Sequence, residues 1–248
     1  MKLSPHAYIV SGLAVEPPWM VNAGFITGHG TTLVVDAGSN YLSARTIHGY
    51  AQSAAPDNTF AVLNTEPHFD HLGGNCYFRD LGLDVHAHPL ARRTEEEFRQ
   101  AREEFNETIP CPARKACFEA DAFFLRTRLA NPNKSLQPGQ RFDLGGVEAA
   151  ILETPGHTPA NISVFVEPDK VLFCGDCVVT GYLPNLEAGG PEAWNTWLGS
   201  LDILQALGPE IIVPGHGDVL LKTEIPAAIE SMRTILRRAI REGKAPTR

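Results

Sequence analysis

Short apolar runs bounded by glycine, proline or charged residues recur along the chain and predict β-strands. Those of the first third are rich in β-branched residues, and similar runs return after residue 146. A longer stretch at residues 41–54, between two of the early strands, is predicted to be a helix. The predicted strands are residues 7–10, 21–27, 31–38, 59–65, 83–88, 147–154, 161–167, 170–176 and 210–218.

Apolar residues spaced three and four apart predict further helices. Phe98, Ala101 and Phe105 predict a helix over residues 94–105, and Thr94 with Glu97 has the form of a capping box at its start. A proline- and cysteine-containing break and an aromatic stretch follow, so we interpret residues 94–129 as a helical excursion from the sheet. Two later helices are predicted by the apolar faces Trp194, Trp197, Leu198, Leu201, Leu204 and Ile225, Ile229, Met232, Leu236, Ile240.

The order of these elements predicts an α/β fold. Strands and then helices occur in the first half, and strands interleaved with helices occur in the second. Two sheets packed face to face, with helices on both outer sides, account for this order. No Ser/Gly-rich or charge-only run divides the chain, so we expect a single domain over residues 1–248.

Composition narrows the classes of function. The chain has 21 Lys and Arg against 29 Asp and Glu, a net charge of −8 without a basic cluster, which argues against nucleic-acid and anionic-membrane partners. Its apolar runs are interrupted well short of the roughly 18 residues that a membrane helix needs. Five cysteines, an odd number, are expected to be reduced thiols of a cytoplasmic protein. Cys174 and Cys177 have C-x-x-C spacing but end an apolar strand, so we favour buried structural thiols over a redox pair.

The stretch "NTEPHFDHLGG" at residues 64–74 concentrates potential metal ligands. Pro67 biases Glu66 toward extended backbone, in which residues two apart point the same way. Glu66, His68 and Asp70 would then line one side, and His71 would turn in where the chain bends. Histidine nitrogens and carboxylate oxygens are the ligands of zinc, manganese and iron.

Three further sites support a metal centre. His157 in "TPGHTPAN", Asp176 in "LFCGDC" and His216 in "VPGHGD" each follow an apolar strand in a turn shaped by glycine or proline. Loops on a rigid scaffold are where binding residues concentrate. One such site is unremarkable, but four in this order predict a metal centre. His86 and His88 lie on or just after a strand, and we expect for both a structural role or a place behind the ligands, not ligation.

This pattern resembles the metallo-β-lactamase superfamily, which carries H-x-H-x-D-H after an early strand and then a lone His, Asp and His at later strand ends. The resemblance runs from "TTLVVDAG" to "VPGHG" and implies a four-layer αββα sandwich of two mixed sheets, with metals at one edge. Asp36 matches a common aspartate beneath the metals, although a turn cap is an equal interpretation. By position, the resemblance implies a first metal bound by Glu66, His68 and His157 and a second bound by Asp70, His71 and His216. Asp176 would bridge both metals.

The chain departs from that pattern at Glu66, which replaces the first histidine. In the preferred account Glu66 ligates through oxygen, because every other ligand position is intact. The added carboxylate would raise the pKa of a metal-bound water and favour harder ions such as Mn or Fe. In a second account Glu66 lies behind the ligands and the first metal is weak or absent. In a third it is solvated beside a degenerate site.

The resemblance implies metal-assisted hydrolysis of a small ester, lactone, thioester or amide-type substrate, with two divalent ions, zinc foremost and manganese or iron as alternatives. Asp70 would orient the nucleophile and carry its proton to the leaving group. Residues 94–129 and 178–194 are candidate walls of the substrate site, where Tyr182 would donate to an oxyanion or simply pack. Phe118, Phe123 and Phe124 suggest an apolar cover or a homodimer contact. An iron-dependent, sulfur-dioxygenase-like oxidoreductase and a degenerate metal-binding protein remain alternatives.

Overall fold

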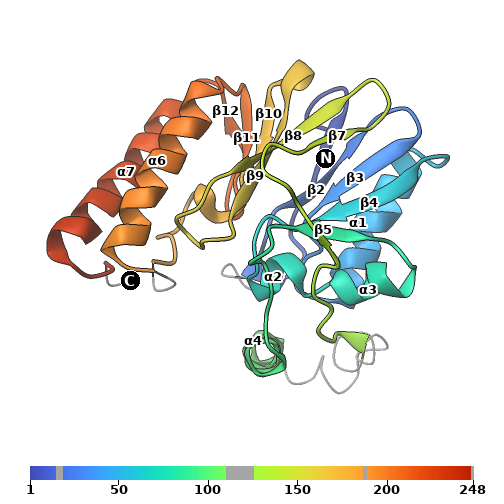
Figure 1. Cartoon of the computed structure of the whole chain (residues 1–248), viewed down its shortest axis with the longest axis horizontal. Helices are drawn as coiled ribbons and strands as arrows, with labels where there is room; N and C mark the ends of the chain where they lie inside the picture. Colours follow the sequence, from blue (N-terminus) through green and yellow to red (C-terminus); the bar gives the residue numbers. More distant parts are fainter. Residues whose placement is uncertain (15–18, 110–125, 187–188, 247–248) are drawn as a thin grey trace.

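Two mixed β-sheets lie face to face in the computed structural model (Figure 1), which describes residues 1–14, 19–109, 126–186 and 189–246. Within these residues each sheet has six strands. The first sheet has the order β1 (Ala7–Val10), β2 (Ala23–Thr27), β3 (Thr31–Val35), β4 (Thr59–Leu63), β5 (Val85–Ala87), β6 (Lys134–Ser135). The second sheet has the order β12 (Leu220–Leu221), β11 (Ile211–Val213), β10 (Val171–Phe173), β9 (Ile162–Val166), β8 (Glu148–Glu153), β7 (Arg141–Asp143).

Both sheets combine parallel and antiparallel pairs. In the first sheet β1, β2 and β3 pair antiparallel, and the pairs from β3 to β6 are parallel. In the second sheet only β10 and β11 pair in parallel among the described strands. The parallel strands β3 and β4, and likewise β10 and β11, end at the same edge of their sheets, which is where the candidate ligands follow.

The helices begin with local signals that the sequence carries. The side chain of Asn40 accepts hydrogen bonds from Leu42 and Ser43 at the start of α1 (Tyr41–Ala54). The predicted capping box of Thr94 and Glu97 starts α4 (Glu95–Glu107). The other helices are α2 (Phe69–Leu72), α3 (Asn75–Asp80), α6 (Pro191–Ala206), α7 (Ile225–Glu242) and the short 3₁₀ helices η3 (Glu167–Asp169) and η4 (Gly175–Cys177).

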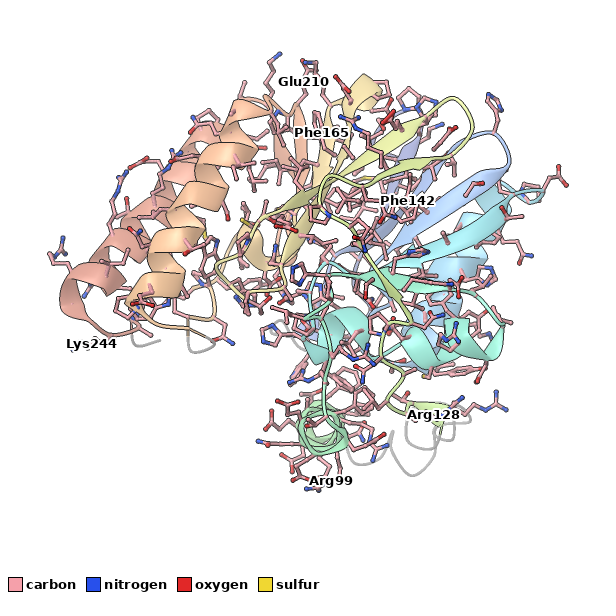
Figure 2. The ribbon with its side chains drawn as sticks, in the orientation of Figure 1. Arg99, Arg128, Phe142, Phe165, Glu210 and Lys244 are labelled. Atoms are coloured by element: carbon pink, nitrogen blue, oxygen red, sulfur yellow. The ribbon has the colours of Figure 1, made fainter. Side chains whose placement is uncertain are left out.

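Three apolar layers hold the sandwich together. The first fills the space between the sheets, the second lies between the second sheet and the pair α6 and α7, and the third lies between the first sheet and α1. Phe142 of β7 packs against the first layer, whereas Phe165 of β9 belongs to the second, so strands of one sheet contribute side chains to both of its faces (Figure 2). Each fully buried large apolar side chain contributes about 1.5–3 kcal/mol. The four-layer αββα prediction is therefore confirmed.

Differences from the prediction lie mainly at element ends. The strands predicted at residues 170–176 and 210–218 are only three residues long, because the chain turns where the candidate ligands begin. The short strands β6, β7 and β12 were not predicted, since two or three residues show no detectable alternation. Of the predicted excursion, α4 is described, whereas residues 110–125, with Phe118, Phe123 and Phe124, lie outside the described residues. None of the described helices is both long enough and apolar enough to cross a membrane.

Candidate metal centre

The candidate ligands come from loops at one edge of the two facing sheets. Four of them follow β4 on and around α2, and the others follow β8, β10 and β11 of the second sheet. A backbone hydrogen bond of 2.9 Å from Ile162 to Thr65 joins the two sheets beside the ligands. The seven side chains are Glu66, His68, Asp70, His71, His157, Asp176 and His216.

Three of these side chains form the first ligand group, Glu66, His68 and His157. Their ligand atoms all lie within 4.8 Å of one another. His68 Nδ1 is 2.9 Å from Glu66 Oε2 and 3.0 Å from His157 Nε2. Glu66 is fully buried, with 0% of its surface exposed, which contradicts the account in which it is a solvated residue.

Asp70, His71 and His216 form the second ligand group, again with ligand atoms within 4.8 Å of one another. His216 Nε2 lies 3.0 Å from Asp70 Oδ2, and His71 Nε2 lies 3.9 Å from the same oxygen. Asp176 lies between the groups, with Oδ2 3.4 Å from His157 Nε2 and Oδ1 3.4 Å from His216 Nε2. The structure thus brings together the two sets of three and the intervening aspartate that the sequence predicted.

These side chains fit divalent cations. Both carboxylate oxygens of Glu66, Nε2 of His71 and Oδ1 of Asp176 are buried and have no hydrogen-bond partner among the described residues. Buried polar atoms are normally hydrogen-bonded, because an unpaired one costs several kcal/mol. Two divalent ions would satisfy these atoms, and nitrogen with carboxylate oxygen suits zinc, manganese and iron.

Asp36 orients His71 from behind the ligand groups. Its Oδ2 lies 2.9 Å from His71 Nδ1, so His71 presents Nε2 to the ligand groups. The same carboxylate accepts hydrogen bonds of 2.8 Å from the backbone and from the hydroxyl of Thr65. Asp36 has φ of 64°, a conformation that costs a non-glycine residue roughly 1–3 kcal/mol. These contacts favour the interpretation of Asp36 as a support of the centre over that of a turn cap.

Like His71, His157 and His216 direct Nε2 toward the ligand groups, and backbone carbonyls orient their rings. His157 Nδ1 lies 3.1 Å from the carbonyl oxygen of Asn185, and His216 Nδ1 lies 3.2 Å from that of Met20. A nitrogen that donates to a carbonyl leaves the opposite ring nitrogen as the acceptor or ligand atom. Both rings therefore direct Nε2 toward the shared space.

Glycine beside two of the ligands permits close backbone approach. A β-carbon at residue 215 would lie 1.9 Å from Asp176 Oδ1, far inside contact distance. Gly175 has φ of 50°, and a β-carbon there would lie 2.7 Å from the hydroxyl of Thr65. The glycines of "CGDC" and "VPGHG" thus allow the two sheets' loops to meet around Asp176.

Electrostatics favour protonated histidines when ions are absent. Burial disfavours the charged form of His157, but Glu66 and then Asp176 outweigh it and raise its pKa to about 9. Burial likewise opposes the charge of His216, and Asp176 with Asp70 raises its pKa to about 9. At neutral pH a metal ion must therefore displace protons from both rings.

A cavity of about 880 Å³ opens above the ligands. Apolar side chains of Trp19, Phe69, Val179 and Leu183 form much of its wall, and α4 contributes to the rim. Both segments expected as walls take part, since Tyr182 and its neighbours line it from the loop after Asp176. Tyr182 is 43% exposed there.

Two residues of this wall were not predicted from the sequence, Trp19 and Arg93. Trp19 lies far from the ligand motifs in the chain, and its ring meets Phe69 and Phe105 edge-on. Arg93 comes just before α4, beside a similar Arg92, and no pattern separates the two. The place of Arg93 in the wall follows from the tertiary structure, in which α4 packs against α2.

His86 and His88 belong to neither ligand group and make structural contacts, and Cys174 and Cys177 are among the described free thiols. The ring of His86 packs edge-on against Phe142, and His88 accepts a hydrogen bond from the backbone of Leu90. Cys174 and Cys177 are buried and unpaired, and burial raises the pKa of the Cys177 thiol to about 12.

The chain belongs to the metallo-beta-lactamase superfamily, which it matches over residues 17–216. It is 26% identical over 186 residues to the hydroxyacylglutathione hydrolase of Methylococcus capsulatus, covering 74% of this chain and 58% of that one. It is 27% identical over 166 residues to the acyl-coenzyme A thioesterase MBLAC2 of Gallus gallus, covering 64% and 58%. The chain thus spans less than two thirds of the length of either relative.

The fold is also similar to that of solved structures. A metallo-beta-lactamase family protein of Thermus thermophilus superposes with a TM-score of 0.71 at 23% identity, covering 96% of this chain and 81% of that one. At this identity the likeness establishes the fold, and it agrees with the two-sheet arrangement described above.

Proposed function

We propose that this chain is a metal-dependent hydrolase of thioesters. The observation that carries the proposal is the pair of ligand groups at the floor of a cavity large enough for a small organic substrate. The names of the two relatives, a hydrolase of an acylated thiol and an acyl-coenzyme A thioesterase, favour thioesters within the broader set of esters, lactones and amides.

The first ligand group and the second would each hold one divalent ion, with Asp176 reaching both. Bound there, the ions would supply a nucleophile from water at neutral pH and polarise the scissile carbonyl. Zinc is the expected metal, and manganese and iron suit the carboxylate-rich ligands as well. The first account of Glu66, ligation through oxygen, is the one supported by its burial and its unpaired oxygens.

Asp70 is the proposed proton carrier. Its carboxylate belongs to the second group and also lines the cavity, so it lies next to both the ligands and the substrate. His71 and His216 oppose the effect of burial and lower its pKa to about 2, so at neutral pH the carboxylate is ionised and can accept a hydrogen bond from the attacking water. It would take the proton of the attacking water and hand it to the departing thiolate. A thiol has a pKa of about 8.5, so the leaving group needs little assistance.

We propose that different parts of the cavity wall bind the two ends of the substrate. The apolar side chains of Trp19, Phe69 and Leu183 suit an acyl group. Among the described residues that line the cavity, Arg93 is the one arginine or lysine, and no described carboxylate lies within 4.0 Å of its guanidinium. Two reciprocal hydrogen bonds with Asn131, 2.8 and 2.9 Å long, fix its backbone. We therefore expect the thiol part to carry an anionic group that binds Arg93.

The test is a substrate panel with zinc-loaded protein: thioesters of anionic and neutral thiols, oxygen esters, lactones and a β-lactam. The expected result is hydrolysis of thioesters, with the highest kcat/KM for anionic thiols. Arg93→Ala should raise KM for anionic thioesters by roughly tenfold, the value of about one charged hydrogen bond, and leave neutral ones unchanged. Arg99→Ala removes the same charge from the outward side of α4, where Arg99 pairs with Glu96 and Glu103, and serves as the control (Figure 2).

Other outcomes would redirect the assignment. Iron in the protein as purified, with oxygen consumption on a persulfide and no thioester turnover, would replace the hydrolase by the oxidoreductase. No metal uptake, with thermal stability unaffected by chelator, would support the degenerate metal-binding alternative. Preferential β-lactam hydrolysis would keep the metal chemistry and overturn the thioester specificity.

A further inference from the structure

The two oxygens of Glu66 face different ligand groups. Oε2 is 2.9 Å from His68 Nδ1 and 3.3 Å from His157 Nε2, both in the first group. Oε1 is 3.0 Å from Nε2 of His71, in the second group. A ligand of the first group alone would have no reason to place one oxygen against the second.

The two oxygens of Asp176 also face different ligand groups. Its Oδ2 lies 3.4 Å from His157 Nε2, on the side of the first group. Its Oδ1 lies 3.3 Å from His71 Nε2 and 3.4 Å from His216 Nε2, on the side of the second. The ligand atoms of Glu66, His71 and Asp176 also lie within 4.8 Å of one another, a third grouping that crosses the first two.

Burial makes this arrangement costly unless positive charge is present on both sides of Glu66. Its side chain is fully buried, and among the described residues the histidine nitrogens 2.9–3.3 Å away form no hydrogen bond of normal geometry with either carboxylate oxygen. A buried carboxylate requires a charged partner or a metal. The backbone prevents an easy escape, because Glu66 follows directly on Thr65, whose amide and hydroxyl are held by Asp36.

We propose that Glu66 bridges the two metal positions, one oxygen toward each, as a second bridging carboxylate beside Asp176. This inference rests on the metal centre of the proposed function but is independent of the substrate. A histidine at position 66, as in the motif that the chain resembles, would offer one ligand atom and could serve only one ion. The glutamate would therefore couple the occupancy of the two positions.

Stepwise zinc binding tests the bridge. Metal-free wild type, Glu66→Gln, Glu66→His and His68→Ala would be titrated with zinc by calorimetry, with stoichiometry checked by elemental analysis. A bridge predicts two zinc ions in wild type and a loss of at least about tenfold in both binding steps for Glu66→Gln. His68→Ala, which removes a ligand of the first group alone, should weaken one step. Glu66→His should restore one step and leave the other weak.

The contrary results are distinct. If Glu66→Gln weakens one step or neither, Glu66 is not a bridge. Should the variants fail to fold, as judged by circular dichroism, a zinc-loaded wild-type crystal decides. The bridge requires each Glu66 oxygen within roughly 2.0–2.2 Å of a different ion, and both oxygens on one ion would refute it. Wild type that binds fewer than two ions overturns the bridge and the two-ion centre together, whereas a two-zinc protein that hydrolyses no thioester overturns only the proposed function.

Discussion

The two ligand groups of this protein differ in how firmly their histidines are held. His71 of the second group is fully buried, and its Nδ1, the ring nitrogen that points away from the ligand groups, contacts Asp36. His68 of the first group has 27% of its side chain exposed and lines the cavity. In His68 it is Nδ1 that faces the ligand groups, and the described residues form no hydrogen bond to its Nε2. Among the described contacts, His71 is therefore held more firmly than His68, and we expect the second group to be the better preorganised of the two.

This difference suggests that the two groups bind metal ions with different affinities. A preorganised set of ligands binds more tightly, because less conformational entropy is lost on binding. We expect the second group to fill first and the first group, nearer the solvent, to adapt as substrate enters.

Asp176→Asn should have the largest effect, because Asp176 contacts histidines of both groups. Losing a charged ligand from both positions would remove several kcal/mol of transition-state stabilisation, roughly a thousandfold or more in kcat/KM. Steady-state hydrolysis by zinc-loaded protein measures it. Asp169→Asn is the matched control, since Asp169 contacts Ser4 and His6 away from the ligands. Near-normal turnover of the Asp176 variant would remove Asp176 from the mechanism.

Asp36→Asn should affect zinc binding by the two groups differently. It leaves the ligands intact but replaces the carboxylate behind His71 by an amide, which orients the ring less firmly. Loss of such a partner costs roughly 10–100-fold in metal affinity. The tighter zinc-binding step should therefore weaken, and the weaker step should change much less. Equal weakening of both steps would show that the groups are not held independently by their supports.

Acidity should affect the two groups of the metal-free protein alike, because His157 and His216 both have a pKa raised to about 9. A raised pKa in the folded state adds stability that is complete below the unfolded value near 6.5 and is lost as pH rises through about 9. The free energy of unfolding, measured by urea titration with chelator present, should fall between about pH 6.5 and about pH 8.5. With zinc bound the fall should be much smaller, since the ions take the place of the protons. A flat profile without metal would contradict the protonation of these rings.

Tyr182→Phe should have the smallest effect, because Tyr182 belongs to neither group and is partly exposed in the cavity wall. Loss of one solvent-accessible hydrogen bond should change kcat/KM by about threefold or less. A loss of about a hundredfold, confined to kcat, would instead assign the hydroxyl to the developing oxyanion.

A further pocket borders this wall. It lies between the loop of Val179 and Tyr182 and the apolar face of α7 near Met232. Because Tyr182 borders both spaces, the same variant should also be compared on short and long acyl chains. A change confined to long chains would place the end of the acyl group against α7.

The sequence by itself determined the layer arrangement and the identity of the candidate ligands. Apolar alternation and spacing fix which residues face a core, and strand ends with Gly- or Pro-shaped turns mark where ligands can project. The helix at residues 41–54 and the capping box at Thr94 were equally local, so they agree with α1 and α4 as found. These features could be predicted because each depends on a short segment of the chain and its own backbone conformation.

The tertiary structure alone decided how the ligands share space. Spacing along the chain could place Glu66 near His68, but not its second oxygen against His71. Nor could it select Arg93 or Trp19 for the cavity wall, because each reaches that wall only through the packing of segments distant in sequence. Distances across two facing sheets depend on core packing between them, and no short stretch of sequence contains that information.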